Sequence, residues 1–189
     1  NGTLAFTTPP AAPPLGTKAL EFTSTNGKPV VTYAGVPTAD AARPLLAELT
    51  KASYASLIHT QPQSALDIGM QFEVTDSTST HFPSSHYTTV VFEPYQQPDS
   101  ETLDQWHRHT VDFGKVWSTQ AASSANPTHC TQADPCPLDQ YIQENPEARV
   151  LTAKFRIGQN SGTGWGGFDG FIDDVKLGFG PVVEYDMGG

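Results

Sequence analysis

The sequence predicts an all-β chain, folded as a two-sheet antiparallel β-sandwich with one short helix near residues 138–145. The first observation is period-2 alternation: Leu66, Ile68, Met70, Phe72 and Val74 alternate without a break against polar or small residues. That pattern gives a strand one buried and one wet face. The second observation is the high content of turn-forming residues: 16 Gly and 16 Pro in 189 residues divide the chain into short segments. Strands with one apolar face each are buried most simply by stacking two sheets.

The elements follow from local pattern. The residues TLAFTT form a strand over 3–8 that the run PPAAPP ends, so residues 1–14 are an N-terminal strand and Pro-rich linker of a single domain, 1–189. Asn26-Gly27 predicts a tight turn, which makes residues 18–34 a hairpin. Residues 39–52 are ambiguous, because Leu45, Leu46 and Leu49 have helical spacing. The further strands are expected at 53–60, 66–74, 87–95, 107–114, 115–118, 149–157, 171–178 and 181–185.

Three segments are expected to lie outside these strands. Residues 119–137 are polar and form a long excursion, and PLDQYIQENP has a short helical pattern that Pro146 ends. Residues 158–170 form a Gly-rich loop without a phosphate-binding motif.

In the strand 149–157, Leu151, Ala153, Phe155 and Ile157 are expected to face inward.

Charge and composition restrict the partners. With 10 Lys+Arg against 20 Asp+Glu, the net charge of −10 argues against nucleic acid and anionic membranes. No apolar run has the length of a membrane span. Asn1 is expected to be a processed N-terminus, and Asn1-Gly2-Thr3 is a glycosylation sequon. Low Lys content and high Thr, Ser, Gly and Pro content suit a secreted, extracellular protein.

The two cysteines, Cys130 and Cys136, are expected to form a disulfide. They enclose a loop of five residues, and a secreted chain favours oxidation. The alternative is two free thiols, whereas a zinc site needs more ligands at the right spacing.

The C-terminal half resembles a known kind of domain. It contains FEPY, the pair Trp106 and Trp117, a cysteine-bearing loop, NPEARV, a Gly-rich loop and GFDGFIDDVKLGFG. In this order, over residues 60–180, it resembles secreted microbial jelly-roll domains of the galactose-binding-like, carbohydrate-binding-module type. The resemblance implies a jelly-roll sandwich, a last core strand at FIDDV and, often, a structural calcium.

A calcium site is expected around Asp173 and Asp174. Alternation places Phe171, Asp173 and Val175 on one face and Asp174 on the other, so one carboxylate lies near the core and needs a cation or several donors. Calcium with loop carbonyls satisfies this need, and Asp169 and Glu21 are further candidate ligands. The alternative is hydrogen bonding to backbone N–H groups of the Gly-rich loop.

Aromatic residues are the candidate ligand-binding groups. Trp165 stands on the Gly-rich loop, where an exposed ring would stack on a sugar, and Tyr95 follows a strand. The alternative for Trp165 is that its ring folds back to cap the core. Trp106 and Trp117 are candidates too, although a core position is the favoured interpretation of both. His107 and His109 share a strand face as in metal-binding HxH pairs, with Asp112 nearby and His81 and His86 elsewhere; the alternative is two surface imidazoles.

Three functions follow as expectations. The first is a non-catalytic, secreted or cell-surface module that binds a polysaccharide or other glycan. The second is a structural subunit of an extracellular assembly that self-associates through the N-terminal strand. The third is a polysaccharide lyase or hydrolase that uses His107, His109 and Tyr95 or Glu93. No catalytic residue is assigned, because no nucleophile motif is present and Asp67 and Glu73 lie about 20 Å apart along one strand.

Overall fold

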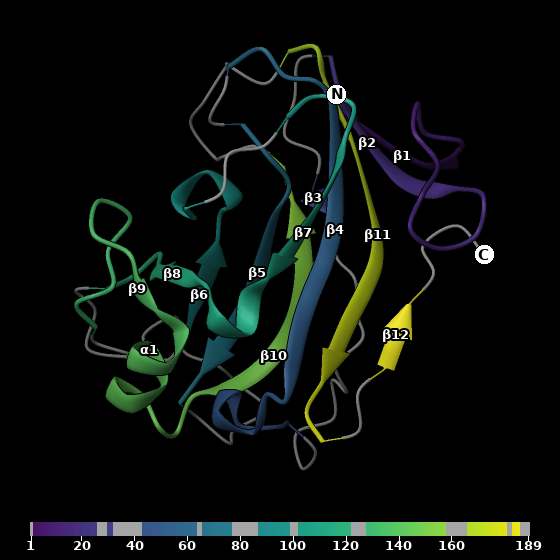
Figure 1. The fold of residues 1–189 in the computed structure, drawn as a ribbon. Helices are drawn as coiled ribbons and strands as arrows, with labels where there is room; N and C mark the ends of the chain where they lie inside the picture. The colour runs from purple at the N-terminus through teal and green to yellow at the C-terminus, as the bar shows by residue number, and fades with distance from the viewer. Residues whose placement is uncertain are drawn as a thin grey trace.

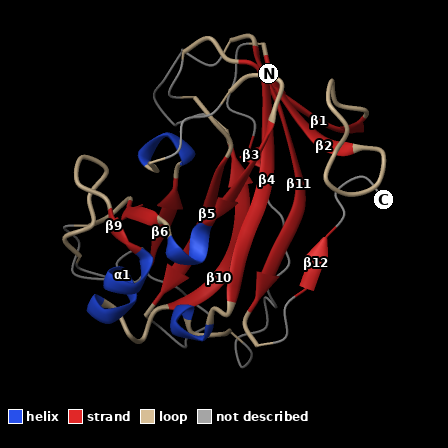
Figure 2. Ribbon diagram, viewed as in Figure 1, coloured by secondary structure: helices blue, strands red, loops and turns tan. Residues whose placement is uncertain are grey.

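The computed structural model describes residues 2–25, 30–31, 43–63, 66–76, 87–98, 102–121, 128–157, 166–180 and 183–185. They form two antiparallel sheets packed face to face, with one α-helix at the end of the sandwich that also carries β8 and β9 (Figures 1 and 2). The predicted two-sheet architecture is therefore confirmed.

Within the described residues, each sheet has six strands. The first sheet has the order β1 (Gly2–Thr7), β2 (Ala19–Ser24), β11 (Phe168–Gly178), β4 (Lys51–Thr60) and β7 (Trp106–Thr110), with β12 (Val183–Tyr185) also paired to β11. The second has the order β3 (Val30–Val31), β10 (Arg149–Arg156), β5 (Gly69–Thr75), β6 (Tyr87–Phe92), β8 (Lys115–Ser118) and β9 (Cys136–Pro137).

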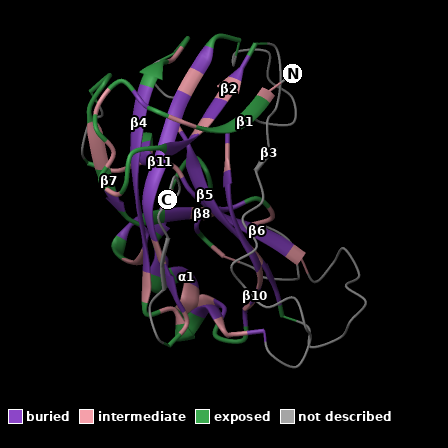
Figure 3. Cartoon of the chain, turned by 90° about the vertical axis from the view of Figure 1, so that its right-hand side faces the viewer, coloured by how far each residue is buried: buried purple, intermediate pink, exposed green. Residues whose placement is uncertain are grey.

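The core fills the space between the sheets, where Figure 3 shows the strands as mostly buried. Tyr54 of β4 is fully buried, and its hydroxyl donates to the Ile68 carbonyl at 2.6 Å. Its ring packs edge-on against Phe155 of β10 and Phe92 of β6, with centroids 4.9 and 6.3 Å away. One side chain thus joins both sheets without leaving a polar atom unsatisfied.

Two predicted alternations have different outcomes. Ile68, Met70, Phe72 and Val74 all lie in the core, as predicted. In β10, however, the register shifts between Val150 and Thr152, so Val150 is buried and Leu151 is not. The expected inward position of Leu151 is wrong because this bulge adds one residue to the strand.

The predicted hairpin over 18–34 is also wrong. β2 pairs with β1 and β11 in the first sheet, whereas β3 pairs with β10 in the second. The chain crosses from one layer to the other between these strands. A turn signal does not specify the sheet to which the next strand belongs; Asn26-Gly27 itself lies outside the described residues.

The N-terminal strand pairs within its own sandwich. All six residues of β1 are in register with β2, although Leu4 and Phe6 stay exposed. The residues between β1 and β2, 8–18, form a Pro-rich strap over the outer face of the first sheet. Ala11 of the strap packs there against Ala19, Leu57 and Phe171.

The alternation predicted for residues 171–176 fails at a second bulge. Phe171 lies in the outer cluster whereas Val175 lies in the core, so they do not share a face. The register with β4 shifts between Asp173 and Lys176, and Asp174 has a positive φ of 48°. One residue added to β11 therefore changes the direction of every side chain after Asp173.

Short helical turns replace parts of the predicted strands. The predicted helix is α1 (Leu138–Glu144), and the leucine pattern at 45–49 gives only a 3-10 turn, Leu46–Glu48. The strand predicted to residue 95 ends at Phe92 before the turn Pro94–Gln96. The strand predicted over 107–114 ends at Thr110 before the turn Val111–Phe113.

Candidate functional site

A pocket of about 460 Å³ opens along β7, the strand at one edge of the first sheet. We call it the edge pocket. One wall is β7 itself, and the other is the segment after β6, with the turn Val111–Phe113 at its end. Its lining residues are Phe92, Gln97, Pro98, Trp106, His107, Arg108, His109, Thr110, Phe113 and Gly114.

Strand alternation sets the roles of the β7 residues. Tyr54 is in register with His109, and both belong to the inner side of the first sheet. His109 is only 8% exposed; its Nε2 is 2.7 Å from the Ser56 hydroxyl, and its ring centroid is 4.7 Å from that of Tyr54. The alternative interpretation of both histidines as surface imidazoles is thus wrong for His109, which is part of the pocket floor.

His107 is held from outside the strand. The Thr102 backbone N–H donates to its Nε2 at 2.9 Å. The Thr102 carbonyl lies 3.3 Å from the same nitrogen, so Thr102 offers Nε2 both a donor and an acceptor. Two residues apart on β7, His107 and His109 face the same side of the strand, as predicted. Their hydrogen-bond partners are protein groups. Across the described ranges, no group of three or more His, Cys, Asp or Glu is placed to hold a metal ion.

Two aromatic residues stand at the pocket with different exposure. Trp106 is half-buried, and its Nε1–H donates to the Ala11 carbonyl of the strap at 3.2 Å. Phe113 is 84% exposed at the end of its turn, while Val111 of the same turn is buried. Gly114 follows because the Phe92 ring occupies the space that a Cβ would take there.

Gln97 is fixed by three hydrogen bonds to the backbone. Its Nε2 donates to the carbonyls of Glu93 and Lys115 at 3.1 and 3.0 Å, and its Oε1 accepts from the Lys115 N–H at 2.9 Å. Because both ends of the amide are engaged, this pocket wall is rigid. The same bonds connect the pocket to a second group of residues around Glu93.

That group, which we call the Glu93 cluster, consists of Glu93, Tyr95, Gln96, Trp117 and Gln132. Trp117 Nε1–H donates to Glu93 Oε2 at 2.7 Å. Gln96 Nε2 donates to the Tyr95 hydroxyl at 3.3 Å and to the Gln132 carbonyl at 3.0 Å. Tyr95 is 45% exposed. Two of the aromatic residues singled out from the sequence thus meet at one carboxyl group.

The surroundings of Glu93 and Tyr95 in this cluster shift the pKa values of both residues. Burial raises the pKa of Glu93, although hydrogen bonds from Trp117, Tyr95 and Gln132 oppose that shift. Burial also raises the pKa of the Tyr95 hydroxyl, and the negative charge of Glu93 adds to the effect. A carboxyl group kept from water beside a phenol can accept a ligand's hydroxyl or exchange a proton.

The four acidic residues predicted to bind calcium form two separate pairs. Leu15 N–H of the strap donates to Asp173 Oδ2 at 2.7 Å, and Asp174 pairs with Arg108 and, at 3.4 Å, with Lys176 Nζ. Asp169 lies four residues, or about 13 Å of strand rise, from Asp173 along β11. Glu21 of β2 is in register with Phe171, between these two positions, and its side chain interacts with that of Asp169.

This arrangement does not fit one calcium ion. Asp174 is neutralised by protein cations, and Asp173 accepts from the strap. Most of the Gly-rich loop lies outside the described residues, so the alternative of hydrogen bonds from that loop stays a prediction. Burial, followed by the neighbouring Glu21, raises the pKa of Asp169. Calcium binding at Glu21 and Asp169 stays a prediction.

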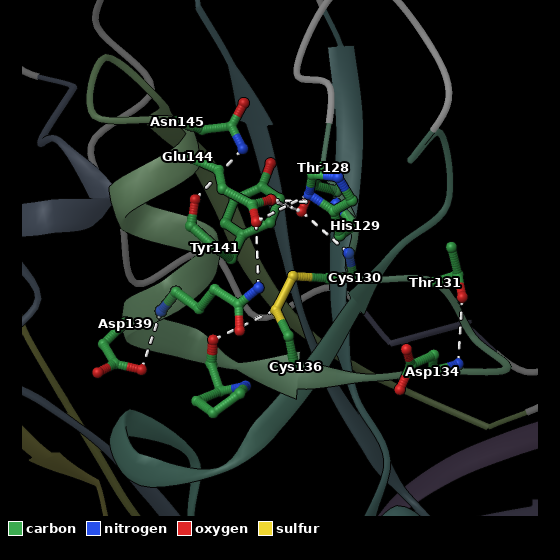
Figure 4. Close-up of a disulfide and its surroundings, with 12 residues drawn as sticks. Thr128, His129, Cys130, Thr131, Asp134, Cys136, Asp139, Tyr141, Glu144 and Asn145 are labelled. Carbon is green, nitrogen blue, oxygen red and sulfur yellow. Dashed lines mark hydrogen bonds and ion pairs between the residues drawn. A yellow bond between two sulfur atoms is a disulfide. The ribbon is translucent and has the colours of Figure 1, made fainter.

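The disulfide between Cys130 and Cys136 is confirmed, with Cα atoms 5.0 Å apart (Figure 4). It closes the loop 131–135, whose Gln132 belongs to the Glu93 cluster. Glu144 of α1 holds the preceding segment, because its Oε2 accepts from the Thr128 hydroxyl and from the His129 N–H (Figure 4). The second of these bonds is 3.1 Å long.

Several predicted site residues lie outside the described residues: Asn1, His81, His86 and Trp165. Conversely, sequence reasoning missed Phe113, Gln97 and Arg108. The only signal for Phe113 was an aromatic residue next to a glycine between two short strands. Gln97 and Arg108 carry no motif, and only the fold brings them to one pocket.

None of the helices in the described ranges has the length and hydropathy of a membrane-spanning segment. No protein-family model matches the chain, and no curated protein or solved structure matches it either. The resemblance to carbohydrate-binding domains therefore stays a prediction, and function is argued from the geometry of the pocket.

Proposed function

We propose that this chain is a non-catalytic β-sandwich module that binds a glycan in the edge pocket. The observation that carries the proposal is the composition of that pocket, which combines Trp106 and the exposed Phe113 with the polar side chains of Gln97, His107 and Thr110. Its volume of about 460 Å³ is within the usual range of small-molecule sites.

The chemistry of a sugar matches this combination. A pyranose ring has an apolar C–H face that packs on an aromatic ring and a rim of hydroxyls that needs hydrogen bonds. Phe113 provides an apolar surface that is otherwise left in water. The Gln97 side chain and the His107 ring are both held by hydrogen bonds, which reduces the entropy lost when a ligand is ordered.

The Glu93 cluster extends this surface. Gln97 joins the two regions, and Tyr95 presents a second exposed ring. A glycan longer than the pocket would thus meet Tyr95 next. Trp117, bonded to Glu93, acts in this proposal as the support that orients the carboxyl group rather than as a stacking platform.

The finer features predicted from the sequence belong to the same proposal. We propose a jelly-roll connection of the strands and an extracellular location, which the disulfide suits because such bonds persist in oxidising compartments. A glycan on Asn1 and calcium at Glu21 and Asp169 are consistent with that location and await direct measurement.

Affinity electrophoresis through gels that contain xylan, galactomannan, a soluble cellulose derivative or polygalacturonate tests glycan binding. Phe113→Ala should weaken retention about tenfold, or ~1.4 kcal/mol. Phe6→Ala is the matched control, because Phe6 is equally an exposed phenylalanine (57%) but lies on β1, at the opposite edge of the sheet. Absence of retention in every gel, or equal retention of both variants, would contradict the proposal.

The other two functions find less support in the described residues. A glycosidase carboxylate pair lies about 5–9.5 Å apart. Glu73 and Glu93 are offset by four residues across β5 and β6, or about 13 Å. The N-terminal strand, which self-assembly would employ, pairs within its own sheet.

A further inference from the structure

We propose that the edge pocket selects an acidic saccharide, one that carries carboxylate or sulfate groups, over a neutral one. This inference rests on the proposed glycan binding and adds the class of ligand. The chain has 20 Asp+Glu and a net charge of −10. Among the described residues that line the edge pocket there is no Asp or Glu, whereas Arg108, His107 and His109 are present. The described lining of the edge pocket therefore lacks the acidic residues that give the whole chain its negative charge.

Arg108 is held in place from behind. Its Nη2 donates to Asp174 Oδ2, and the Asp174 side chain is only 4% exposed whereas that of Arg108 is 50% exposed. The bulge in β11, with Asp174 at φ 48°, brings this carboxylate to Arg108. Asp174 is thus a positioning residue: it fixes the guanidinium and leaves its other edge toward solvent.

The charges are arranged with the cations outward. Lys176 Nζ also lies 3.4 Å from Asp174, so two cations share one buried carboxylate. Asp173 is fully buried and accepts from Leu15 N–H of the strap. A ligand that reaches the pocket over the outer face of β7 therefore meets the half-exposed guanidinium first, with the buried carboxylates of Asp173 and Asp174 beneath it. Among the described residues, Nη2 is the Arg108 nitrogen engaged by Asp174, so further N–H donors of the fork remain for a ligand.

Such a guanidinium favours anions. Its planar fork matches carboxylate and sulfate oxygens in pairs, and these charge-assisted hydrogen bonds are about twice as strong as neutral ones. A neutral hydroxyl in the same place would displace water from a charged group without compensating it fully. Strand alternation directs the side chains of His107 and His109 to the other face of β7, so the preference for anions proposed here rests on Arg108.

Calorimetry on the wild-type protein tests the inference without any variant. The probes are an oligogalacturonate and its fully methyl-esterified form of equal length, in which a methyl group on each carboxyl removes the charge. A sulfated and an unsulfated galactan oligosaccharide form a second pair, which tells sulfate from carboxylate. We expect the acidic member of at least one pair to bind about tenfold tighter. Its affinity should fall as NaCl rises from about 50 to 500 mM.

The variant Arg108→Gln should bring the affinity for the acidic ligand down to that for the neutral one. Arg156→Gln, on β10 in the other sheet, is the control and should keep the difference. If Arg108→Gln does not fold, the two wild-type ligand pairs decide alone. Equal binding of acidic and neutral members overturns the inference but leaves glycan binding in place. Failure of all four ligands and of the gel test overturns both.

Discussion

Glu93 is a carboxyl group with little access to water that nevertheless has donors from three segments of the chain. Trp117 comes from β8, Tyr95 from the turn after β6, and Gln132 from the disulfide loop. Burial raises the pKa of Glu93 and the three hydrogen bonds lower it. The net shift is upward, so the desolvation of the carboxylate outweighs its hydrogen bonds. Folding thus favours the protonated form of Glu93.

The variant Glu93→Gln should raise the melting temperature at pH 7. The stability that the raised pKa provides is fully present below the unfolded value, near 4.5, and is lost as the pH rises through the higher folded value. Gln is neutral and keeps an oxygen for Trp117, so its advantage should shrink to nothing at pH 4. Calorimetric scans at both pH values measure this. Glu147→Gln, at an exposed site, is the control, and a less stable Glu93→Gln at pH 7 would contradict the argument.

At the same scale, the sequence identified Tyr95, Trp117 and Glu93 as separate candidates but not the contact among them. Tyr95 and Trp117 are aromatic residues in recognisable positions, whereas Glu93 joins them only through the pairing of β6 with β8. Asp173 and Asp174 show the opposite problem. A buried carboxylate was correctly expected there, but the partners of both residues depend on a bulge and on a strap that begins more than 150 residues earlier.

Among the elements, α1 and the disulfide loop form one unit. Glu144, in the last turn of the helix, accepts hydrogen bonds from Thr128, His129 and Gln140, and the Thr128 hydroxyl contributes most to lowering its pKa to about 2. The helix thereby holds the chain just before Cys130, and the disulfide holds the loop that contains Gln132.

Glu144→Gln should cost about 1–2 kcal/mol of unfolding free energy at pH 7, the usual value of hydrogen bonds to a charged group. Because the folded pKa is lowered, this stability is present above the unfolded value of 4.5 and is lost as the pH falls through about 2. Urea unfolding at pH 7 and pH 2 should show the difference from wild type and then its disappearance. For the control Asp139→Asn, on the same helix, the difference in unfolding free energy from wild type should not disappear between pH 7 and pH 2. If Glu144→Gln loses the same unfolding free energy at both pH values, the role of the charge is refuted.

Element positions were predictable where the pattern was strong and local. The alternation over 66–74 and the helix before Pro146 depend on neighbouring residues alone, and both are found. The hairpin over 18–34 failed because β2 pairs with β1 on one side and, on the other, with β11, about 150 residues away in the chain. Strand ends failed at residues 94 and 111, where short 3-10 turns begin. No local signal distinguishes such a turn from one more residue of strand.

For the whole molecule, the strap connects the fold to the site. It covers the apolar residues of the first sheet's outer face, donates to the buried Asp173 and accepts from Trp106 of the edge pocket. The layered architecture could be predicted from strand amphipathicity, but not this covering, because PPAAPP indicates only that a ladder ends. The N-terminal residues are accordingly expected to stabilise the molecule through the strap rather than through β1.

Two truncations separate these contributions. Removing residues 1–7 deletes β1, which is largely exposed and paired with β2 alone among the described strands, so we expect a loss of about 1 kcal/mol. Removing residues 1–17 also deletes most of the strap. It uncovers Leu57 and Phe171 and leaves Asp173 without the Leu15 donor, which should cost about 3 kcal/mol or more beyond the first truncation. Urea unfolding measures both, and the shorter chain should also lose glycan affinity because Trp106 loses its bond to Ala11. Equal stability of the two truncated chains would show that the strap only lies on the sheet and does not hold it together.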